Sequence, residues 1–402
     1  MKSIGAITGD IVGSVYEFNN HRSKDFPLFS DDSEFTDDSI LTIATMMALM
    51  NGGKSDDFVD AYRRLGNKYP SSYGNRFSDW LAVDNPEPYD SWGNGSAMRV
   101  SPVAWWSNDI DEVATLAKVS AEVTHNHPEG VKGAQSVAEA IFLARTGKSK
   151  QDIKKHVEER HGSFLDFKLA DIRKTYPFDE SSAGTVPPAI VAFLESTDFE
   201  DAIRNAISIG GDSDTLAAIT GSIAEAFYGG VPNDIMGDVL FKYLDEDLRK
   251  IVRDFNQAIA PILMVSKFQT LSKVGTETLH SLNQRIQTHN GKWSERHNGK
   301  KLESGANTMP YTEQSELIQE FVQFMYDYDL VINFDWAGWQ EGREWFASDN
   351  ESKYDDLDIE TSLKLLTAII RSDRFNEGAL VRAFEDGAIP KITAELYVKT
   401  KE

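Results

Sequence analysis

The chain has 402 residues, among them 64 acidic and 41 basic side chains, so its formal net charge is −23, and it contains no cysteine. Two domains are expected because one hydrophobic core rarely extends beyond roughly 250–300 residues, and the hydrophobic share of 41% is that of an ordinary globular protein. The negative charge argues against non-specific nucleic-acid binding, and the missing cysteines exclude disulfides, thiolate metal sites and a cysteine nucleophile.

No secretory signal is expected from the first ten residues. Residues 1–10 contain one lysine and a mixed stretch with Thr8 and Asp10, without a long apolar run. No later stretch reaches the roughly 18 consecutive apolar residues of a membrane span. We therefore expect a cytoplasmic protein that does not bind membranes.

Residues 1–266 are predicted to form a string of helices. Apolar residues recur there at helical spacing, and Gly or Pro clusters interrupt them. The pattern is clearest over residues 40–50 and 216–228, each of which is followed by a pair of glycines that ends a helix. Little alternation of apolar and polar residues is present, so the expected fold class is all-α.

Acidic residues gather in front of both of these helices, at residues 36–38 and 212–215. Helix capping alone explains either cluster, since a first-turn carboxylate gains about 0.3–1 kcal/mol from the helix dipole. Two such clusters in one core would repel each other unless dications bound there. Their hard oxygen ligands suit Mg²⁺, Mn²⁺ or Ca²⁺ rather than zinc.

Three further segments carry candidate binding residues. Residues 9–17 combine small residues with a carboxylate, Glu17. Residues 91–99 are a Gly-rich turn that offers backbone N–H groups to an anion such as a diphosphate, although no strand precedes it and it is not a dinucleotide-binding fingerprint. Residues 124–128 hold two histidines without a third His or Cys nearby, which favours a polar ligand-contact loop over a zinc site.

The last third of the chain changes character twice. Residues 267–309 are polar and are expected to be a linker or a loose extension. Residues 310–402 recover helical periodicity and hold an aromatic cluster around Trp336, which predicts a small, mainly helical C-terminal domain. The expected organisation is a catalytic domain over 1–266, this linker, and a C-terminal domain of unknown function.

Taken together, the segments T-D-D, G-N-G-x-A-M-R and G-G-D-x-D-T, in that order, resemble the ADP-ribosylglycohydrolase family over residues 4–247. The resemblance implies a compact helical bundle with two divalent ions, Mg²⁺ or Mn²⁺, in a central cleft. The metal ligands that it implies are Thr36, Asp37, Asp38, Asp212, Asp214 and Thr215. The catalytic carboxylates that it implies are Glu17, Asp37 and Asp38. The substrate-binding residues that it implies are Gly74, Ser91, Trp92, Gly93, Asn94, Gly95 and His125.

The function implied by this resemblance is hydrolysis of a C1″ glycosidic bond. The substrate would be an ADP-ribosylated protein side chain or small molecule, and ADP-ribose would be the product. Metals that chelate the ribose hydroxyls would orient a water while the bond breaks through an oxocarbenium-like state, and a nearby carboxylate would act as acid, base or charge stabiliser. Arginine, serine, nucleobase and small-molecule linkages all stay open. The C-terminal domain faintly resembles an uncharacterised bacterial domain sometimes fused to such hydrolases, and is a candidate for binding a further partner.

Two other functions remain open on the sequence. One is a non-hydrolytic ADP-ribose-binding module in which the metals serve recognition only, although Glu17 and both acidic clusters are intact and disfavour it. The other is a hydrolase of another ribosyl or nucleotide-derived small molecule, or the immunity half of a toxin pair.

Overall fold

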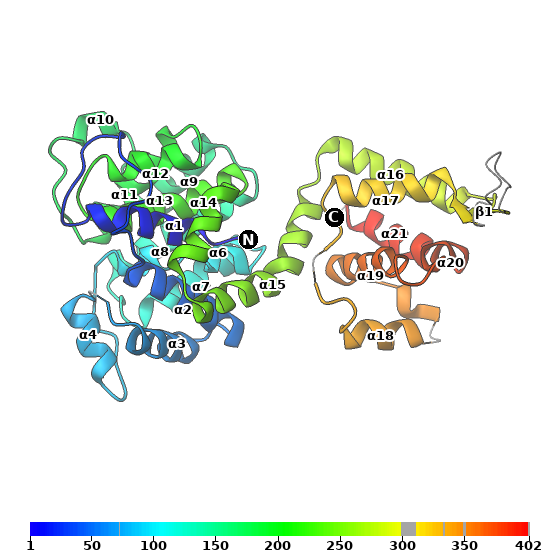
Figure 1. The fold of residues 1–402 in the computed structure, drawn as a ribbon, viewed down its shortest axis with the longest axis horizontal. Helices are drawn as coiled ribbons and strands as arrows, with labels where there is room; N and C mark the ends of the chain where they lie inside the picture. Colours follow the sequence, from blue (N-terminus) through cyan, green and yellow to red (C-terminus); the bar gives the residue numbers. More distant parts are fainter. Residues whose placement is uncertain (72, 299–310, 333, 349–350, 401–402) are drawn as a thin grey trace, which may run out of the picture. The chain divides into compact units, whose positions relative to one another are not determined.

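The computed structural model describes the whole chain apart from residues 72, 299–310, 333, 349–350 and 401–402. The chain divides into two compact units, Met1–Ile259 (unit 1) and Ala260–Glu402 (unit 2). Figure 1 shows that each unit is built from helices.

The described residues of unit 1 form fifteen helices, the last of which, α15, continues into unit 2. They are α1 (Gly5–Gly13), α2 (Asp37–Asn51), α3 (Ser55–Lys68), α4 (Asn75–Ala82), α5 (Gly95–Met98), α6 (Val103–Trp106), α7 (Ile110–Glu122), α8 (Pro128–Arg145), α9 (Lys150–His161), α10 (Leu169–Ile172), α11 (Ser182–Glu195), α12 (Phe199–Ile207), α13 (Ser213–Tyr228), α14 (Asn233–Asp238) and α15 (Glu246–Gln269). A 3₁₀ turn (Ser14–Tyr16) follows α1, and a π-helical turn (Val239–Tyr243) follows α14.

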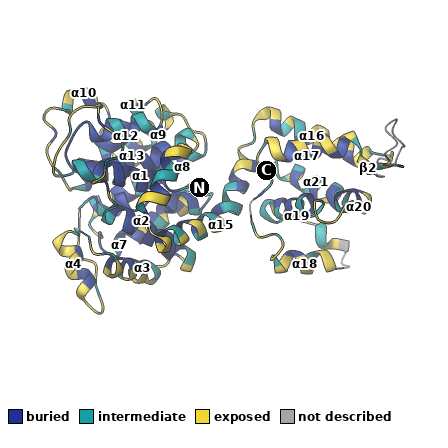
Figure 2. Cartoon of the chain, viewed as in Figure 1, coloured by how far each residue is buried: buried dark blue, intermediate teal, exposed yellow. Residues whose placement is uncertain are grey.

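The centre of unit 1 is the pair α1 and α13. Every residue of α1 is buried, and α13 is buried from Ser213 to Ala226, as the dark colour of both helices in Figure 2 shows. Glycines make this close packing possible: a Cβ added at Gly9 would lie 2.0 Å from the backbone oxygen of Ala217. The two helices therefore touch backbone to backbone, and the side chains at their ends are held at fixed positions.

The two helices with the clearest sequence pattern are α2 and α13. Each ends at a glycine with positive φ, Gly52 (φ 135°) and Gly229 (φ 86°), where other residues would be strained. Thr36 occupies the N-cap position of α2, and its side chain accepts a hydrogen bond from the backbone N–H of Asp38 at 3.3 Å. The acidic clusters thus lie at the beginning of two core helices.

Unit 2 is a smaller helical unit with a core of its own. Besides the end of α15 it contains α16 (Lys273–Thr288), β1 (Ser294–His297), β2 (Tyr311–Gln314), α17 (Glu316–Asp327), α18 (Gln340–Ala347), α19 (Ile359–Ser372), α20 (Ala379–Glu385) and α21 (Ala388–Lys399), and a 3₁₀ turn (Glu351–Tyr354). The two strands pair antiparallel, with Ser294 opposite Gln314.

The range 267–309, expected to be a polar linker, differs from that expectation. Residues 273–288 form α16, whose side chains Leu279, Leu282 and Ile286 are buried in the core of unit 2. Residues 299–309 lie outside the described part of the chain. The segment 273–288 is folded because the face of α16 that carries these three apolar side chains packs into the core of unit 2.

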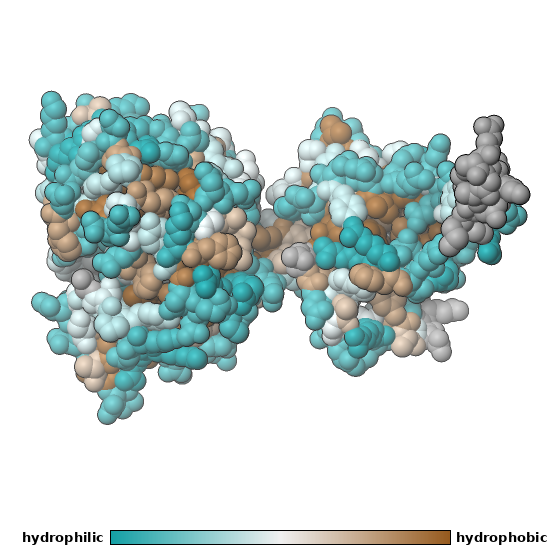
Figure 3. All heavy atoms as spheres, viewed as in Figure 1, coloured by the Kyte–Doolittle hydropathy of each residue, from teal (hydrophilic) through white to brown (hydrophobic). Residues whose placement is uncertain are grey.

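The all-α fold class is confirmed, since β1 and β2 are the only paired strands in the described residues. On the face shown in Figure 3, hydrophilic residues cover much of each unit, and patches of hydrophobic residues are visible among them within each unit. Among the described helices, none combines the length and the apolar character needed to cross a membrane.

Candidate functional site

The acidic clusters meet where α1, α2 and α13 come together. Asp10 of α1 is fully buried and accepts hydrogen bonds from the backbone N–H groups of Thr36 (2.9 Å) and Ser39 (3.0 Å). The hydroxyl of Thr36 donates to the same carboxylate at 2.7 Å, and the hydroxyl of Ser39 donates to it as well. Asp10 therefore fixes the first turn of α2, which carries Asp37 and Asp38, against α1.

The second cluster is joined to the first by short contacts. The hydroxyl of Thr215 donates to Asp38 at 3.3 Å, across 177 residues of sequence. Two sets of three carboxylates each place one oxygen per residue within 4.8 Å of one another, and both sets include Asp214. These sets are Asp10, Asp38 and Asp214, and Glu17, Asp212 and Asp214.

The electrostatics of this cluster are unfavourable without a cation. Burial, and after it repulsion by Asp212 and Asp37, raises the pKa of Glu17 to about 8. Burial, and then repulsion by Asp10, raises the pKa of Asp37 to about 7, while burial raises that of Asp10 to about 6 despite its hydrogen bonds. The causes are loss of hydration and like charge, both of which a bound dication would offset.

One buried oxygen in the cluster, Oδ1 of Asp38, has no hydrogen-bond partner among the described residues. A buried carboxylate oxygen without a donor costs about 1–3 kcal/mol or more. The donor set here is made only of carboxylate and hydroxyl oxygens, which is the set that Mg²⁺, Mn²⁺ and Ca²⁺ prefer. The residues present thus fit a divalent cation.

A cavity of about 420 Å³ opens onto this cluster. Of the residues that the sequence predicts for the site, only Thr36 does not line it; its hydroxyl turns to Asp10 instead. The predicted residues on its wall are Glu17, Asp37, Asp38, Gly74, Ser91, Trp92, Gly93, Asn94, Gly95, His125, Asp212, Asp214 and Thr215.

The Gly-rich turn is held open by the residues that lead into α11. The backbone N–H of Asn94 donates to the carbonyl of Glu180 at 2.8 Å, and the hydroxyl of Ser182 donates to that of Gly93, also at 2.8 Å. The side chain of Asn94 donates to Asp212 at 2.6 Å, so the turn is also tied to the acidic cluster. Trp92 is 55% exposed and is therefore not a core residue.

A sequence model of the ADP-ribosylglycohydrolase family matches residues 3–262, well over half of the chain. The chain belongs to the ADP-ribosylglycohydrolase family. Both the family and the enzyme class, a glycosidic-bond hydrolase, are thus as the sequence predicts. Residues 272–401 match a second model, described as a family of unknown function (DUF6508).

Similar proteins include ADP-ribosylhydrolase ARH3 of Mus musculus, which is 27% identical over 304 residues that cover 56% of this chain and 82% of the relative. ADP-ribosylarginine hydrolase Tri1 of Pseudomonas putida (strain GB-1) is 26% identical over 257 residues, covering 56% of this chain and 69% of the relative. A solved structure named "ADP-ribosylglycohydrolase-related protein complex" is 22% identical, with a TM-score of 0.49 and coverage of 64% of this chain and 96% of that chain.

The structure adds residues to this candidate site that sequence reasoning missed. Asp10 binds both Thr36 and Ser39, and it precedes Glu17 by nearly two helical turns, a spacing that could have drawn attention to it. Arg99, the last residue of G-N-G-x-A-M-R, lines the cavity although it is only 1% exposed. No local pattern shows that this arginine is buried, because its partners come from α3 and α7.

Two other features of unit 1 look like sites but differ from the acidic cavity. Glu139 of α8 is buried, and its Oε2 is 2.6 Å from Nε2 of His156, 3.1 Å from Nε2 of His161 and 3.3 Å from Nε of Arg160. The trio Glu139, His156 and His161 has metal-ligand spacing. The guanidinium of Arg160 already supplies the positive charge, so we interpret this cluster as an ion pair that joins α8 to α9.

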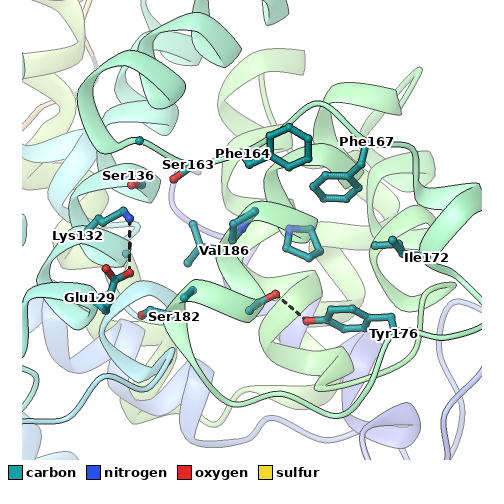
Figure 4. A pocket seen from close by; sticks show the side chains of 16 residues that line it. Glu129, Lys132, Ser136, Ser163, Phe164, Phe167, Ile172, Tyr176, Ser182 and Val186 are labelled. Atoms are coloured by element: carbon teal, nitrogen blue, oxygen red, sulfur yellow. Dashed lines mark hydrogen bonds and ion pairs between the residues drawn. The ribbon is translucent and has the colours of Figure 1, made fainter.

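The second feature is a cavity of about 540 Å³ beside the beginning of α11, shown in Figure 4. Phe164, Phe167 and Ile172 give it an apolar wall. Among the described residues on that wall, Glu129 is the one acidic residue, and it is paired with Lys132 at 3.5 Å. The described part of this wall therefore offers no cluster of carboxylates to a cation.

Proposed function

We propose that the protein removes ADP-ribose from a modified protein side chain or small acceptor by hydrolysing the C1″ glycosidic bond, with the help of two divalent cations, Mg²⁺ or Mn²⁺. The observation that carries this proposal is the pair of carboxylate trios that share Asp214. All of their members except the buried Asp10 line one cavity. Two neighbouring cation positions with one common ligand fit that arrangement. Family membership and the names of the relatives support the reaction class.

The cations would be held by the six residues of the two clusters. They are Thr36, Asp37, Asp38, Asp212, Asp214 and Thr215, and they offer carboxylate and hydroxyl oxygens. The chemistry that dications would supply when bound here is Lewis acidity, which would orient the ribose hydroxyls and lower the pKa of a water. Neither cluster alone has enough oxygens for octahedral coordination, so the two clusters are expected to bind metal jointly.

The remaining wall of the cavity suits the rest of ADP-ribose. The backbone N–H groups of the turn that contains Gly93 and Gly95 are candidates for binding the diphosphate. Trp92 is exposed at this turn and can stack on adenine. Gly74 lines the same wall, where a Cβ would find open space, and His125 lies against the turn. Binding energy from these contacts would position the distal ribose over the acidic cluster.

Glu17 is the residue that we propose to act on the reacting bond. It lies at the end of the 3₁₀ turn after α1, on the cavity wall. Its carboxyl can hold a proton, because in the cation-free protein burial and then repulsion by Asp212 raise its pKa to about 8. From there it can donate that proton to the leaving atom on C1″ and afterwards accept one from the attacking water. Besides binding metal, Asp37 and Asp38 would stabilise the positive charge that develops on the ribose.

The experiment that tests this function is a turnover assay on defined ADP-ribosyl linkages: arginine, serine, nucleobase and small-molecule acceptors. The full chain is treated with chelator, then assayed with and without added Mg²⁺ or Mn²⁺. We expect release of ADP-ribose from at least one linkage. This release should require added metal and should be lost in Asp214→Asn. Tight binding of ADP-ribose together with no turnover on any of these linkages would instead support the non-hydrolytic binding module.

A further inference from the structure

A buried chain of polar groups leads from α3 to the cavity through Arg99, Thr124 and His125. The guanidinium of Arg99 stacks 4.1 Å from the ring centre of Tyr62 and donates hydrogen bonds to the carbonyl of Ser120 at 3.3 Å and to Oγ1 of Thr124 at 2.7 Å. Oγ1 of Thr124 in turn lies 2.7 Å from Nδ1 of His125. All three residues of the chain are buried.

The direction of these hydrogen bonds follows from counting protons. An arginine has donors only, so Oγ1 of Thr124 must accept from it. The hydroxyl of Thr124 has one proton of its own. Among the described residues, Nδ1 of His125 is the acceptor in contact with this hydroxyl. Nδ1 is then an unprotonated acceptor, and the ring proton is on Nε2.

The opposite tautomer is disfavoured by a buried hydroxyl. If Nδ1 carried the proton and donated it to Oγ1, the hydroxyl proton of Thr124 would have no acceptor among the described contacts, in a position that solvent does not reach. The loss of such a hydrogen bond corresponds to a population ratio of roughly 5- to 150-fold against that tautomer. A doubly protonated ring is disfavoured as well, because burial and then the charges of Arg99 and Arg76 hold the pKa of His125 well below its usual value.

The Nε2 atom faces the Gly-rich turn. A Cβ added at Gly95 would lie 3.2 Å from Nε2, and one added at Gly93 would lie 3.5 Å from it. No hydrogen bond from Nε2 to the described protein residues is formed, and the ring lines the 420 Å³ cavity. The donor is therefore available to a ligand at this turn.

We infer that Thr124 is a positioning residue: it is oriented by Arg99, and it fixes His125 as the Nε2–H tautomer. The Nε2–H group of His125 is then a neutral hydrogen-bond donor for an anionic oxygen of the ligand. The identity of that ligand as ADP-ribose rests on the proposed function, whereas the tautomer does not. Because the tautomer is already selected in the free protein, binding of a phosphate oxygen to this donor does not have to include the free-energy cost of selecting it.

The test compares Thr124→Val, which removes the hydroxyl but keeps the branched shape, with Thr124→Ser, which keeps the hydroxyl. The first readout is the ¹⁵N–¹H spectrum of protein labelled at histidine, with the His125 signals assigned by their loss in His125→Gln. We expect protonated Nε2 and unprotonated Nδ1 in the parent protein and in T124S, and a mixture or a reversal in T124V. Protonated Nδ1 in the parent protein would overturn the inference, and this measurement stands even if T124V does not fold.

The second readout is ADP-ribose binding by calorimetry. T124V should weaken binding about tenfold, while T124S should stay within about twofold of the parent protein. Equal affinity in T124V would overturn the role of Thr124 in ligand binding. If the parent protein does not bind ADP-ribose at all, the proposed function fails, but the tautomer found by ¹⁵N spectroscopy still decides this inference.

Discussion

Glu17 shows how one residue can differ from chemically similar neighbours. It shares the cavity wall with four aspartates, but it extends from the 3₁₀ turn after α1, whereas they lie at the beginnings of α2 and α13. Like Asp38 and Asp212, it belongs to one of the two carboxylate trios. Its separate position on the chain is therefore the reason why we propose that it acts on the reacting bond and is not mainly a metal ligand.

Glu17→Gln is therefore expected to lower kcat by roughly 10²- to 10⁴-fold, because the amide keeps the shape but has no proton to transfer. Metal content and ADP-ribose affinity should be preserved. All three quantities are to be measured on the same preparation. Near-normal turnover would remove Glu17 from the mechanism, and loss of metal would show that it is a ligand instead.

Trp92 carries a second prediction. Its ring is largely exposed beside the Gly-rich turn, and stacking of a base on such a ring contributes roughly 1–3 kcal/mol. Trp92→Ala should thus weaken ADP-ribose binding about tenfold or more in a calorimetric titration. Phe241→Ala, which removes another exposed aromatic ring of unit 1 outside the cavity, is the matched control and should bind normally. Unchanged affinity in W92A would exclude stacking.

At the level of elements, the contact of α1 with α13 sets the distance between Asp10 and Asp214. Both helices are buried, and glycines of α1 lie directly on the backbone of α13. A side chain at one of these glycines has no space to move into because the obstacle is backbone. The cluster thus depends on residues that carry no functional group.

We expect Gly9→Ala to destabilise the protein by about 1–3 kcal/mol in urea unfolding, since its Cβ would overlap the Ala217 carbonyl. It should also lower the metal content, because Asp10 and Asp214 move apart. Gly237→Ala in α14 is the control: nothing lies within 4 Å of its Cβ, so stability should be unchanged or slightly higher. Equal stability of the two variants would contradict the close packing of α1 on α13.

For the whole molecule, the charge of the site couples stability to pH. Asp10, Asp37 and Glu17 have folded-state pKa values raised to about 6, about 7 and about 8. A raised pKa means that the folded protein holds the proton more tightly than the unfolded chain does. The stabilisation that each bound proton gives is complete below the pKa of the unfolded chain, near 4. It is lost as the pH rises through the pKa of the folded protein.

The Tm of chelator-treated protein should consequently decrease as the pH is raised from about 5 to about 8. Added Mg²⁺ or Mn²⁺ should raise Tm most at the upper end of this range, because the ions bind the charged carboxylates. Scanning calorimetry at both pH values measures this metal-induced rise in Tm. Asp214→Asn is the variant that lacks the proposed shared ligand. An equal metal-induced rise in Tm at the two pH values would contradict it.

The division into units leads to the last prediction. Every described residue on the wall of the acidic cavity belongs to unit 1, and unit 2 has a separate hydrophobic core. A protein that ends at Gln269, the last residue of α15, is expected to fold and to retain turnover on a small substrate. Loss of cooperative unfolding in that protein, monitored by circular dichroism, would show that unit 1 needs unit 2 to fold.

The sequence by itself determined the helices of the core and the order of the motifs, because periodicity, caps and terminal glycines are local signals. The helices expected over residues 40–50 and 216–228 are α2 and α13, each with its acidic cluster in the first turn or just before it. The same reasoning did not find α16, although Leu279, Leu282 and Ile286 have helical spacing, because its many polar residues resemble those of a linker.

Only the tertiary structure decided how the acidic clusters meet and what supports them. The contact of Thr215 with Asp38 joins residues 177 positions apart, and the link from Arg99 through Thr124 to His125 depends on packing of helices that are not adjacent in sequence. A sequence shows that a side chain can donate or accept a hydrogen bond. Which groups are buried together, and therefore which of these bonds must form, depends on long-range packing, because an unpaired polar group is costly only where water is excluded.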